Sequence, residues 1–476
     1  MTKITLLGAG SGFTQPLFTD ILNIDGLDAG IIGLVDIDAK RLRVSVKLIN
    51  RILELMGKTN TWSVDASTDR AKVLPGTDYL INTIEVSGVQ CVRFDNDIPL
   101  KYGIDQCIGD TIGPGGIMKA LRTLPPFREI LKDAECLCPG AMIMNYTNPM
   151  SIMTLGSVRT TRMPFVGLCH SVQGSSWQLA NIAGVPVQEV EWKCGGINHL
   201  AWFTEFKHKG KDLYPVLLKA MEKPEIYEKD PVRLDMMRHF GYFVTESSGH
   251  FSEYVPYYRK RPEILKKYCR DGYRGGSSFY ANCWPGWREN ADKIRTEMAA
   301  GTREINLKRG HEYASDIIEG HMFDRNKIVY ASVPNTGLIP NLPLTGVVEV
   351  AVLVNREGYT PTYFGNLPEQ LAALCRANMT VFELVVQGIL NEDRESIVHA
   401  MMLDPLNAAV CCPGDIREMT EELFAAEAKF IPKWCVKPRV SPKRKTPRRA
   451  LPKVKVGVPI ADGAAQVSSM AARNVQ

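Results

Sequence analysis

The sequence predicts an α/β fold whose first part is a doubly wound parallel sheet. Two observations support this prediction: short apolar runs alternate with helical stretches over the first third of the chain, and a glycine-rich turn follows the first apolar run at once. Such alternation is typical of parallel strands that are joined by helices. With 476 residues, of which 45% are hydrophobic and 23% charged, the chain can bury large cores.

The first predicted unit is a strand, a helix and a second strand. Residues 3–7 form an apolar run, the turn Gly8-Ala9-Gly10-Ser11-Gly12 follows, and a second apolar run over residues 30–36 ends on Asp36. Such glycines let the backbone approach a pyrophosphate at a helix N-terminus, and the terminal acid can bind the adenosine ribose. Phe13 replaces the third glycine of the usual pattern. We therefore predict a dinucleotide site at Gly8, Gly10, Ser11 and Asp36, with Asp36 favouring NAD over NADP.

The alternation continues beyond this unit. Helical stretches are expected over residues 39–56 and 118–131, the second broken at Pro125-Pro126, and strands near Trp62 and over residues 79–84 and 141–145. Together these elements complete a Rossmann-type domain over residues 1–165.

Three loops follow predicted strands, where the functional loops of a doubly wound sheet lie. Residues 85–88 begin a long connection that could cover the cofactor, so Glu85 is a candidate cofactor contact. Asp110 lies in a glycine-rich turn over residues 109–116, either above the cofactor or as a helix N-cap. Asn148, restricted by the following proline, presents its amide at the sheet edge.

The stretch from Pro164 to Phe203 carries a possible metal site. An apolar strand delivers Cys169 and His170, and a Gly-Gly bend delivers His199. A thiolate and an imidazole suit a first-row divalent ion and leave much of its coordination sphere open to a substrate. Alternatively, Cys169 and His199 merely pack in a core, but the dinucleotide site upstream favours the metal.

The following residues predict an α+β second domain over residues 166–432. We expect strands within residues 188–206 and over 347–354, and helices over 304–319 and 368–391. Several histidines have no ligand-like partner at short spacing and are interpreted as surface or core residues: His239, His250, His311, His321 and His399.

The net positive charge of the chain comes from its last segment, residues 433–476, which holds eleven Lys and Arg residues and one acidic residue. This composition predicts a disordered basic tail, and nucleic-acid binding would rest on that tail alone. No run of roughly 18 uncharged apolar residues and no signal-peptide pattern occur, so we expect a cytoplasmic protein without membrane contact. The twelve cysteines are scattered and predict neither a zinc ribbon nor a disulfide framework.

Several motifs occur in the order and spacing of glycoside hydrolase family 4: Gly8-Ala-Gly-Ser11, residues 110–117, Asn145-Tyr-Thr-Asn-Pro149, Cys169-His-Ser-Val172, Gly196-Ile-Asn-His199, residues 241–248 and Glu253-Tyr254. Over roughly residues 1–432 the chain resembles this family of NAD- and Mn²⁺-dependent glycosidases with a lactate/malate-dehydrogenase-like fold. The Cys-His-Ser-Val motif is similar to that of the α-galactosidase group and differs from the Asp-Met-Pro or Asn-Val-Pro of phospho-glycosidases. The resemblance implies hydrolysis of terminal, melibiose-like α-galactosides by a homo-oligomer, a dimer or a tetramer.

The resemblance also implies a mechanism and residue roles. In the family, NAD takes a hydride from C3 of the sugar, which acidifies the C2 proton so that elimination replaces displacement. Cys169 and His199 would hold Mn²⁺ as a Lewis acid on the 2- and 3-hydroxyls. Tyr254 would remove the C2 proton, helped by a nearby cation or metal, since a free phenol with a pKa near 10 is a poor base. Either His170 or Asp110 would protonate the leaving group.

Asn148 would hold a sugar hydroxyl in the same scheme. Three other readings stay open. The first is a family 4 glycosidase of another specificity: an α-glucosidase, an α-galacturonidase or a 6-phospho-glycosidase. The second is a hydroxy-acid dehydrogenase, which would share the cofactor domain but need no Cys/His metal. The third is a nucleic-acid or scaffold role carried by the tail.

Overall fold

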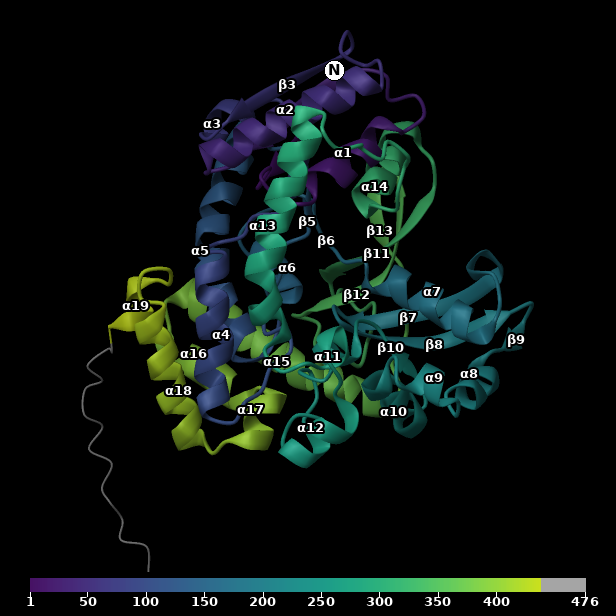
Figure 1. Cartoon of the computed structure of the whole chain (residues 1–476), viewed down its shortest axis with the longest axis vertical. Coiled ribbons are helices and arrows are strands. Elements are labelled where there is room, and N and C mark those ends of the chain that lie inside the picture. The colour runs from purple at the N-terminus through teal and green to yellow at the C-terminus, as the bar shows by residue number, and fades with distance from the viewer. Residues whose placement is uncertain (438–476) are drawn as a thin grey trace, which may run out of the picture. The chain divides into compact units, whose positions relative to one another are not determined.

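A single sheet organises the computed structural model, which describes residues 1–437 (Figure 1). The sheet has thirteen strands, and its main path runs β10-β8-β7-β12-β11-β6-β5-β4-β1-β2-β3, with β13 on β12 and β9 on β8. Of the predicted disordered tail, residues 433–437 lie within the described part, where Lys433–Val436 form a short helix, contrary to the prediction. The rest of the tail lies outside the described residues.

The first six strands are parallel: β1 (Thr2–Leu7), β2 (Gly30–Val35), β3 (Trp62–Ser67), β4 (Tyr79–Asn82), β5 (Met142–Asn145) and β6 (Phe165–Leu168). The helices between them are α1 (Thr14–Leu22), α2 (Ala39–Leu55), α3 (Arg70–Val73), α4 (Val89–Lys101), α5 (Gly113–Leu137) and α6 (Met150–Val158). The spatial order 3-2-1-4-5-6 is that of a doubly wound dinucleotide fold, with its switch point between β1 and β4. The predicted fold class is confirmed.

Later strands extend the same sheet with antiparallel pairing: β7 (Val190–Ile197), β8 (Leu200–His208), β9 (Lys211–Asp212), β10 (Phe243–Val244), β11 (Lys327–Pro334), β12 (Val347–Asn355) and β13 (Gly358–Pro361). Strand β11 joins the two parts by pairing with β6. Because one sheet passes through both predicted domains, the division at residues 165 and 166 stays a prediction.

The remaining helices are α7 (Ser171–Ala183), α8 (Tyr214–Ala220), α9 (Pro224–Tyr227), α10 (Pro231–Phe240), α11 (Ser248–Phe251), α12 (Pro262–Tyr268), α13 (Phe279–Ala300), α14 (Tyr313–Phe323), α15 (Glu369–Asn391), α16 (Arg394–Leu403), α17 (Pro405–Val410), α18 (Pro413–Ala426) and α19 (Lys433–Val436). In Figure 1 the long helix α13 runs from α2 down towards α11, and it packs against α2 and α4. Helix α15 is long and apolar enough to cross a membrane. More than half of its most apolar stretch is buried in the protein, and core helices of soluble proteins can have the same length and composition.

Local sequence explains where α2 begins and which face it buries. The Asp38 carboxylate accepts hydrogen bonds from the amides of Lys40 and Arg41 and so caps α2. The buried residues of α2 recur at helical spacing and face the sheet: Leu42, Ser45, Leu48, Ile49, Ile52 and Leu53.

The bounds predicted for two helices are wrong, and a third helix was missed. Helix α5 begins at Gly113 and continues through Pro125 and Pro126 to Leu137, although each proline removes one backbone donor. Its first three turns are buried against neighbouring helices, and this packing outweighs the lost bonds. Helix α14 begins at Tyr313 rather than at residue 304, and helix α4, which was not predicted, follows the 85–88 loop.

Candidate active site

The turn after β1 fits a dinucleotide because there is no room for a side chain at Gly8 or Gly10. A β-carbon on Gly8, whose φ is +77°, would lie 2.7 Å from the carbonyl oxygen of Thr83, and one on Gly10 would lie 2.7 Å from Asp36 Oδ2. The Gly10 amide donates to Asp36 Oδ2 over 2.7 Å. Gly12 borders open space. The structure thus brings the predicted Gly8, Gly10, Ser11 and Asp36 together at the carboxyl ends of β1 and β2.

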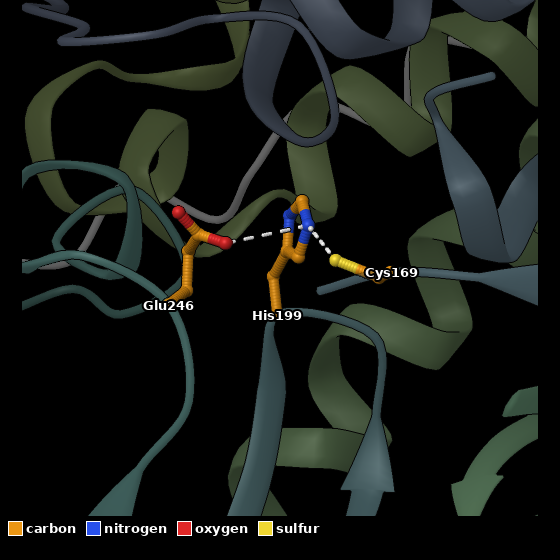
Figure 2. A group of neighbouring side chains, drawn as sticks. All are labelled: Cys169, His199 and Glu246. Atoms are coloured by element: carbon orange, nitrogen blue, oxygen red, sulfur yellow. Dashed lines mark hydrogen bonds and ion pairs between the residues drawn. The ribbon is translucent and has the colours of Figure 1, made fainter. Parts of the chain in front are cut away.

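Cys169, His199 and Glu246 form a compact set of metal donors (Figure 2). His199 Nε2 lies 3.2 Å from Cys169 Sγ and 3.5 Å from Glu246 Oε2. Their donor atoms all lie within 4.8 Å of one another, and thiolate, imidazole and carboxylate all bind first-row divalent ions. The residues therefore fit the predicted metal, and Glu246 is a third candidate ligand that the sequence did not reveal.

The loop that carries His199 differs from its prediction. Gly195 and Gly196 are not a bend but the end of β7, paired with Trp202 and Ala201 of β8. The turn consists of Asn198 and His199, and His199 has a φ of 62°. Glycine is needed at 196 because a β-carbon there would lie 2.5 Å from the Leu200 carbonyl oxygen.

Electrostatics favour a thiolate beside an imidazolium in the metal-free protein. Burial raises the pKa of the Cys169 thiol, but His199 more than offsets this and lowers the pKa to about 7. Burial likewise lowers the pKa of His199, whereas Cys169 and Glu246 raise it to about 10. Cys169 therefore reaches its metal-binding form easily.

A second group of charged residues surrounds Lys119, which lies on α5. Its Nζ lies 3.1 Å from Glu85 Oε2 and 3.2 Å from Asp110 Oδ2, so two predicted site residues share one buried cation. Asp110 does not cap α5, because Ile112 is the N-cap residue. His250 Nε2 lies 3.9 Å from Asp110 Oδ1.

The buried His250 also belongs to this site. Its ring centroid lies 4.7 Å from that of His199, and its Nδ1 lies 3.8 Å from Glu246 Oε1. The interpretation of His250 as an ordinary surface or core histidine therefore missed its place in the cluster. His250 lies four residues after Glu246, but Glu246 was not itself a predicted ligand, and Lys119 lies nine residues after Asp110, so spacing rules did not single out either residue. For Glu246, the quoted motif at residues 241–248 was the only signal.

Glu253 fixes the loop that leads to Asp110. This carboxylate is fully buried and accepts hydrogen bonds from the backbone amides of Cys107, Ile108 and Gly109, at 2.5, 2.7 and 3.2 Å. The next residue along the chain is Tyr254, so one short segment holds both the loop and the predicted base.

Tyr254 lies behind the metal donors. It is fully buried, and its hydroxyl lies 3.4 Å from Nδ1 of His199, the nitrogen opposite the one that faces Cys169. Burial and the carboxylates of Asp110 and Glu246 raise the pKa of Tyr254 well above its usual value. In the metal-free protein Tyr254 is therefore a neutral phenol.

His170 lies on a more open wall of the site. Its side chain is 45% exposed, and its Nε2 lies 3.0 Å from Glu312 Oε2. The Asp20 carboxylate on α1 accepts hydrogen bonds from the amides of Gly310 and Glu312, which fixes the segment that carries Glu312. The half-buried Asn148 precedes Pro149 in a cis peptide bond. Its side-chain amide has no hydrogen-bond partner within residues 1–437.

Comparison with known proteins decides the family. A family model described as family 4 glycosyl hydrolase matches residues 3–185, and the model of the family 4 glycosyl hydrolase C-terminal domain matches residues 194–407. The chain belongs to glycosyl hydrolase family 4. The predicted family is thus confirmed, whereas the roles of individual residues in this family 4 protein stay predictions.

Two curated relatives share most of their length with this family 4 chain. An alpha-galactosidase of Bacillus subtilis (strain 168) is 37% identical over 439 residues, covering 91% of this chain and 100% of the relative. An alpha-galactosidase of Rhizobium meliloti (strain 1021) is 35% identical over 441 residues, covering 91% and 89%. A solved 6-phospho-alpha-glucosidase from gut microorganisms, in complex with NAD and Mn²⁺, has the same fold, with a TM-score of 0.75 at 19% identity over 90% of this chain and 99% of that one.

Proposed function

We propose that this family 4 protein is an NAD- and Mn²⁺-dependent α-galactosidase of terminal, unphosphorylated α-galactosides. The observation that carries the proposal is the donor set of Cys169, His199 and Glu246, which lies in one site with Tyr254 and Asp110. The α-galactosidase activity of the two curated relatives supports the choice of sugar.

The residues present fit both groups. Gly8, Gly10, Ser11 and Asp36 would hold the dinucleotide, and Cys169, His199 and Glu246 the metal ion. When bound, NAD accepts a hydride from the sugar and returns it, and the metal ion acts as a Lewis acid on the sugar hydroxyls.

Tyr254 is proposed as the acceptor of the C2 proton. Burial, together with the carboxylates of Asp110, Glu246 and Glu253, stabilises its neutral form. A phenolate therefore requires that this negative charge be neutralised, which ties proton removal to a fully loaded site. Tyr254 therefore stays protonated until the cofactor and the metal ion are bound.

His170 is proposed as the group that protonates the leaving oxygen. Its exposed ring can reach a substrate, and the Glu312 carboxylate holds that ring in place at 3.0 Å. Asp110 is the weaker candidate. Burial raises its pKa, but Lys119 and His250 more than offset this and hold the pKa below its usual range. Asp110 is therefore ionised and can accept a hydrogen bond from a sugar hydroxyl. The side-chain amide of Asn148 can also bind a sugar hydroxyl.

Three broader features are proposed from the sequence. The chain would act in the cytoplasm as a homo-oligomer, a dimer or a tetramer. Residues 1–165 would form the cofactor domain and residues 166–432 the metal and substrate domain.

A panel of p-nitrophenyl α-glycosides tests the function. Hydrolysis of the α-galactoside should require NAD⁺, Mn²⁺ and a reductant, and no NADH should accumulate. A required 6-phosphate on the sugar would contradict the proposed specificity, and stoichiometric NADH would indicate a dehydrogenase instead.

A further inference from the structure

Helix α13 presents one face along the whole candidate cofactor site. Tyr280 and Trp284, near its N-terminus, line a small cavity together with Glu85, Asp110 and Lys119. Positions 284, 288, 292 and 295 follow Tyr280 at intervals of three or four residues and so share this face. The helix therefore runs from the charged end of the site towards α2, against which it packs (Figure 1).

The C-terminal half of α13 is fixed on the glycine turn. Arg295 donates to the carbonyl oxygen of Ser11 over 2.8 Å and to that of Gly10. Asp292 accepts from Arg41 of α2 over 2.9 Å and also from Arg295. Arg41 in turn donates to the Gly10 carbonyl oxygen. Two guanidinium groups and one carboxylate thus bind α13 to the turn that would hold the dinucleotide.

Arg288, one turn earlier on the same face, has no such partner. Within residues 1–437 its guanidinium makes neither a hydrogen bond nor an ion pair, although the side chain is half-buried. Its Nη1 lies 2.9 Å from the point that a β-carbon on Gly88 would occupy, so it lies against the backbone of the 85–88 loop. Burial and the nearby Arg41 lower its pKa, and the carboxylates of Asp292, Glu85 and Asp36 offset this only in part.

The surroundings of Arg288 indicate which anion is missing. Asp36 and Glu85 are both close enough to act on its charge. Asp36 marks the adenosine ribose end of a dinucleotide site, and Glu85 is linked through Lys119 to Asp110 at the sugar end. The pyrophosphate joins these two ends of a dinucleotide. A guanidinium is also the side chain best suited to bind two phosphate oxygens at once.

We propose that Arg288 binds the pyrophosphate of the dinucleotide, so that α13 adds a cation to the cofactor site beside the glycine turn. The inference rests on the proposed NAD site. In this proposal the negatively charged phosphates of the cofactor are bound by an α13 side chain as well as by the backbone amides of the turn.

Calorimetric binding of NAD⁺, ADP-ribose and adenosine to the full-length protein tests this role. Arg288→Gln should weaken NAD⁺ and ADP-ribose binding about 10- to 100-fold, the range expected for a charge-assisted contact, and leave adenosine binding within about twofold. Arg288→Lys should recover part of the loss, since it restores the charge without the planar fork. The control is Lys293→Gln, which removes the same charge from a 73% exposed position of α13 and should change no affinity.

The outcomes separate the two claims. A wild-type protein that does not bind NAD⁺ would overturn the proposed function and this inference with it. NAD⁺ binding by wild type together with unchanged binding by Arg288→Gln would overturn the inference alone. An equal loss for adenosine and NAD⁺ would also overturn it, because the residue would then support the fold of the site and not the phosphates.

Discussion

The role of Glu246 as a metal ligand can be tested separately from catalysis. Because its Oε2 lies 3.5 Å from His199 Nε2, Glu246→Gln removes one anionic donor and should weaken Mn²⁺ binding at least about tenfold. Cys169→Ser should weaken it further, since the thiolate is lost. Titration of the protein with Mn²⁺, followed by electron paramagnetic resonance, gives both affinities.

A surface pair supplies the control for this measurement. Glu189 Oε2 lies 2.9 Å from His208 Nε2 with a 45% exposed carboxylate, so Glu189→Gln breaks a similar contact away from the site and should leave Mn²⁺ binding unchanged. Equal affinities for wild type and Glu246→Gln would remove Glu246 from the ligand set.

The roles of His170 and Asp110 differ in how they depend on the leaving group. His170→Gln should slow hydrolysis of a disaccharide about 10²- to 10⁴-fold, but slow a p-nitrophenyl galactoside much less, because nitrophenolate leaves without a proton. Asp110→Asn should slow both substrates to a similar extent. Steady-state kinetics on the two substrates measures this, and the reverse pattern would exchange the two assignments.

How far the sequence specified the site can be judged from these residues. Cys169, His199, Tyr254 and Asp110 stand in motifs and were predicted to act together, and the structure places them in one cluster. Glu246, His250 and Lys119 were missed. Lys119 lies on α5, far from Glu246 and His250 in the chain, and only the fold brings these residues together.

At the scale of secondary structure, α14 and β11 are joined by an ion cluster around Glu319. Its carboxylate, 7% exposed, lies 2.6 Å from Arg309, 2.9 Å from Arg325 and 3.2 Å from Lys327. Burial raises the pKa of Glu319, but these cations more than offset it and lower the pKa to about 2. A lowered carboxyl pKa stabilises the fold above the unfolded-state pKa of about 4.5, and the effect is lost as the pH falls towards 2.

Glu319→Gln should therefore destabilise the protein at pH 7 by about 1 to 2 kcal/mol, an amount reduced by the partial exposure of the three cations. The difference from wild type should shrink between pH 4.5 and pH 3, as denaturant unfolding can measure. Glu54→Gln, in an exposed pair with Arg51, should have little effect at any pH. A Glu319→Gln difference that is constant with pH would show that packing, not charge, is responsible.

Strands and helices were predicted correctly where the hydrophobic pattern was clear. They were predicted wrongly where packing against neighbouring elements determines the structure. Strands β1, β2, β4, β5 and β12 were predicted within about two residues of their bounds. Helix α5 was predicted too short because proline counts against a helix locally, whereas the buried α5 is stabilised by its neighbours. The missed α4 carries charged residues and Pro99, so its sequence gives a weak helical signal.

At the scale of the whole molecule, the strand order explains why the cofactor and metal residues meet. The glycine turn follows β1 and Cys169 follows β6, and both strands belong to the parallel part of one sheet, whose carboxyl ends share an edge. The antiparallel strands β7 and β8 extend this sheet and deliver His199 at their turn. The sequence predicted the parallel part, but not that the second half continues the same sheet, because antiparallel pairing between distant strands leaves no local pattern.

Elimination at C2, with Tyr254 as the base, is the central step of the proposed mechanism. The direct measurement is hydrolysis of an α-galactoside in D₂O, with the released galactose analysed by nuclear magnetic resonance for deuterium at C2. We predict deuterium at C2 with wild type, and with Tyr254→Phe a rate loss of about 10²- to 10⁴-fold while NAD⁺ and Mn²⁺ still bind. Galactose released by wild type without deuterium at C2 would contradict the elimination mechanism.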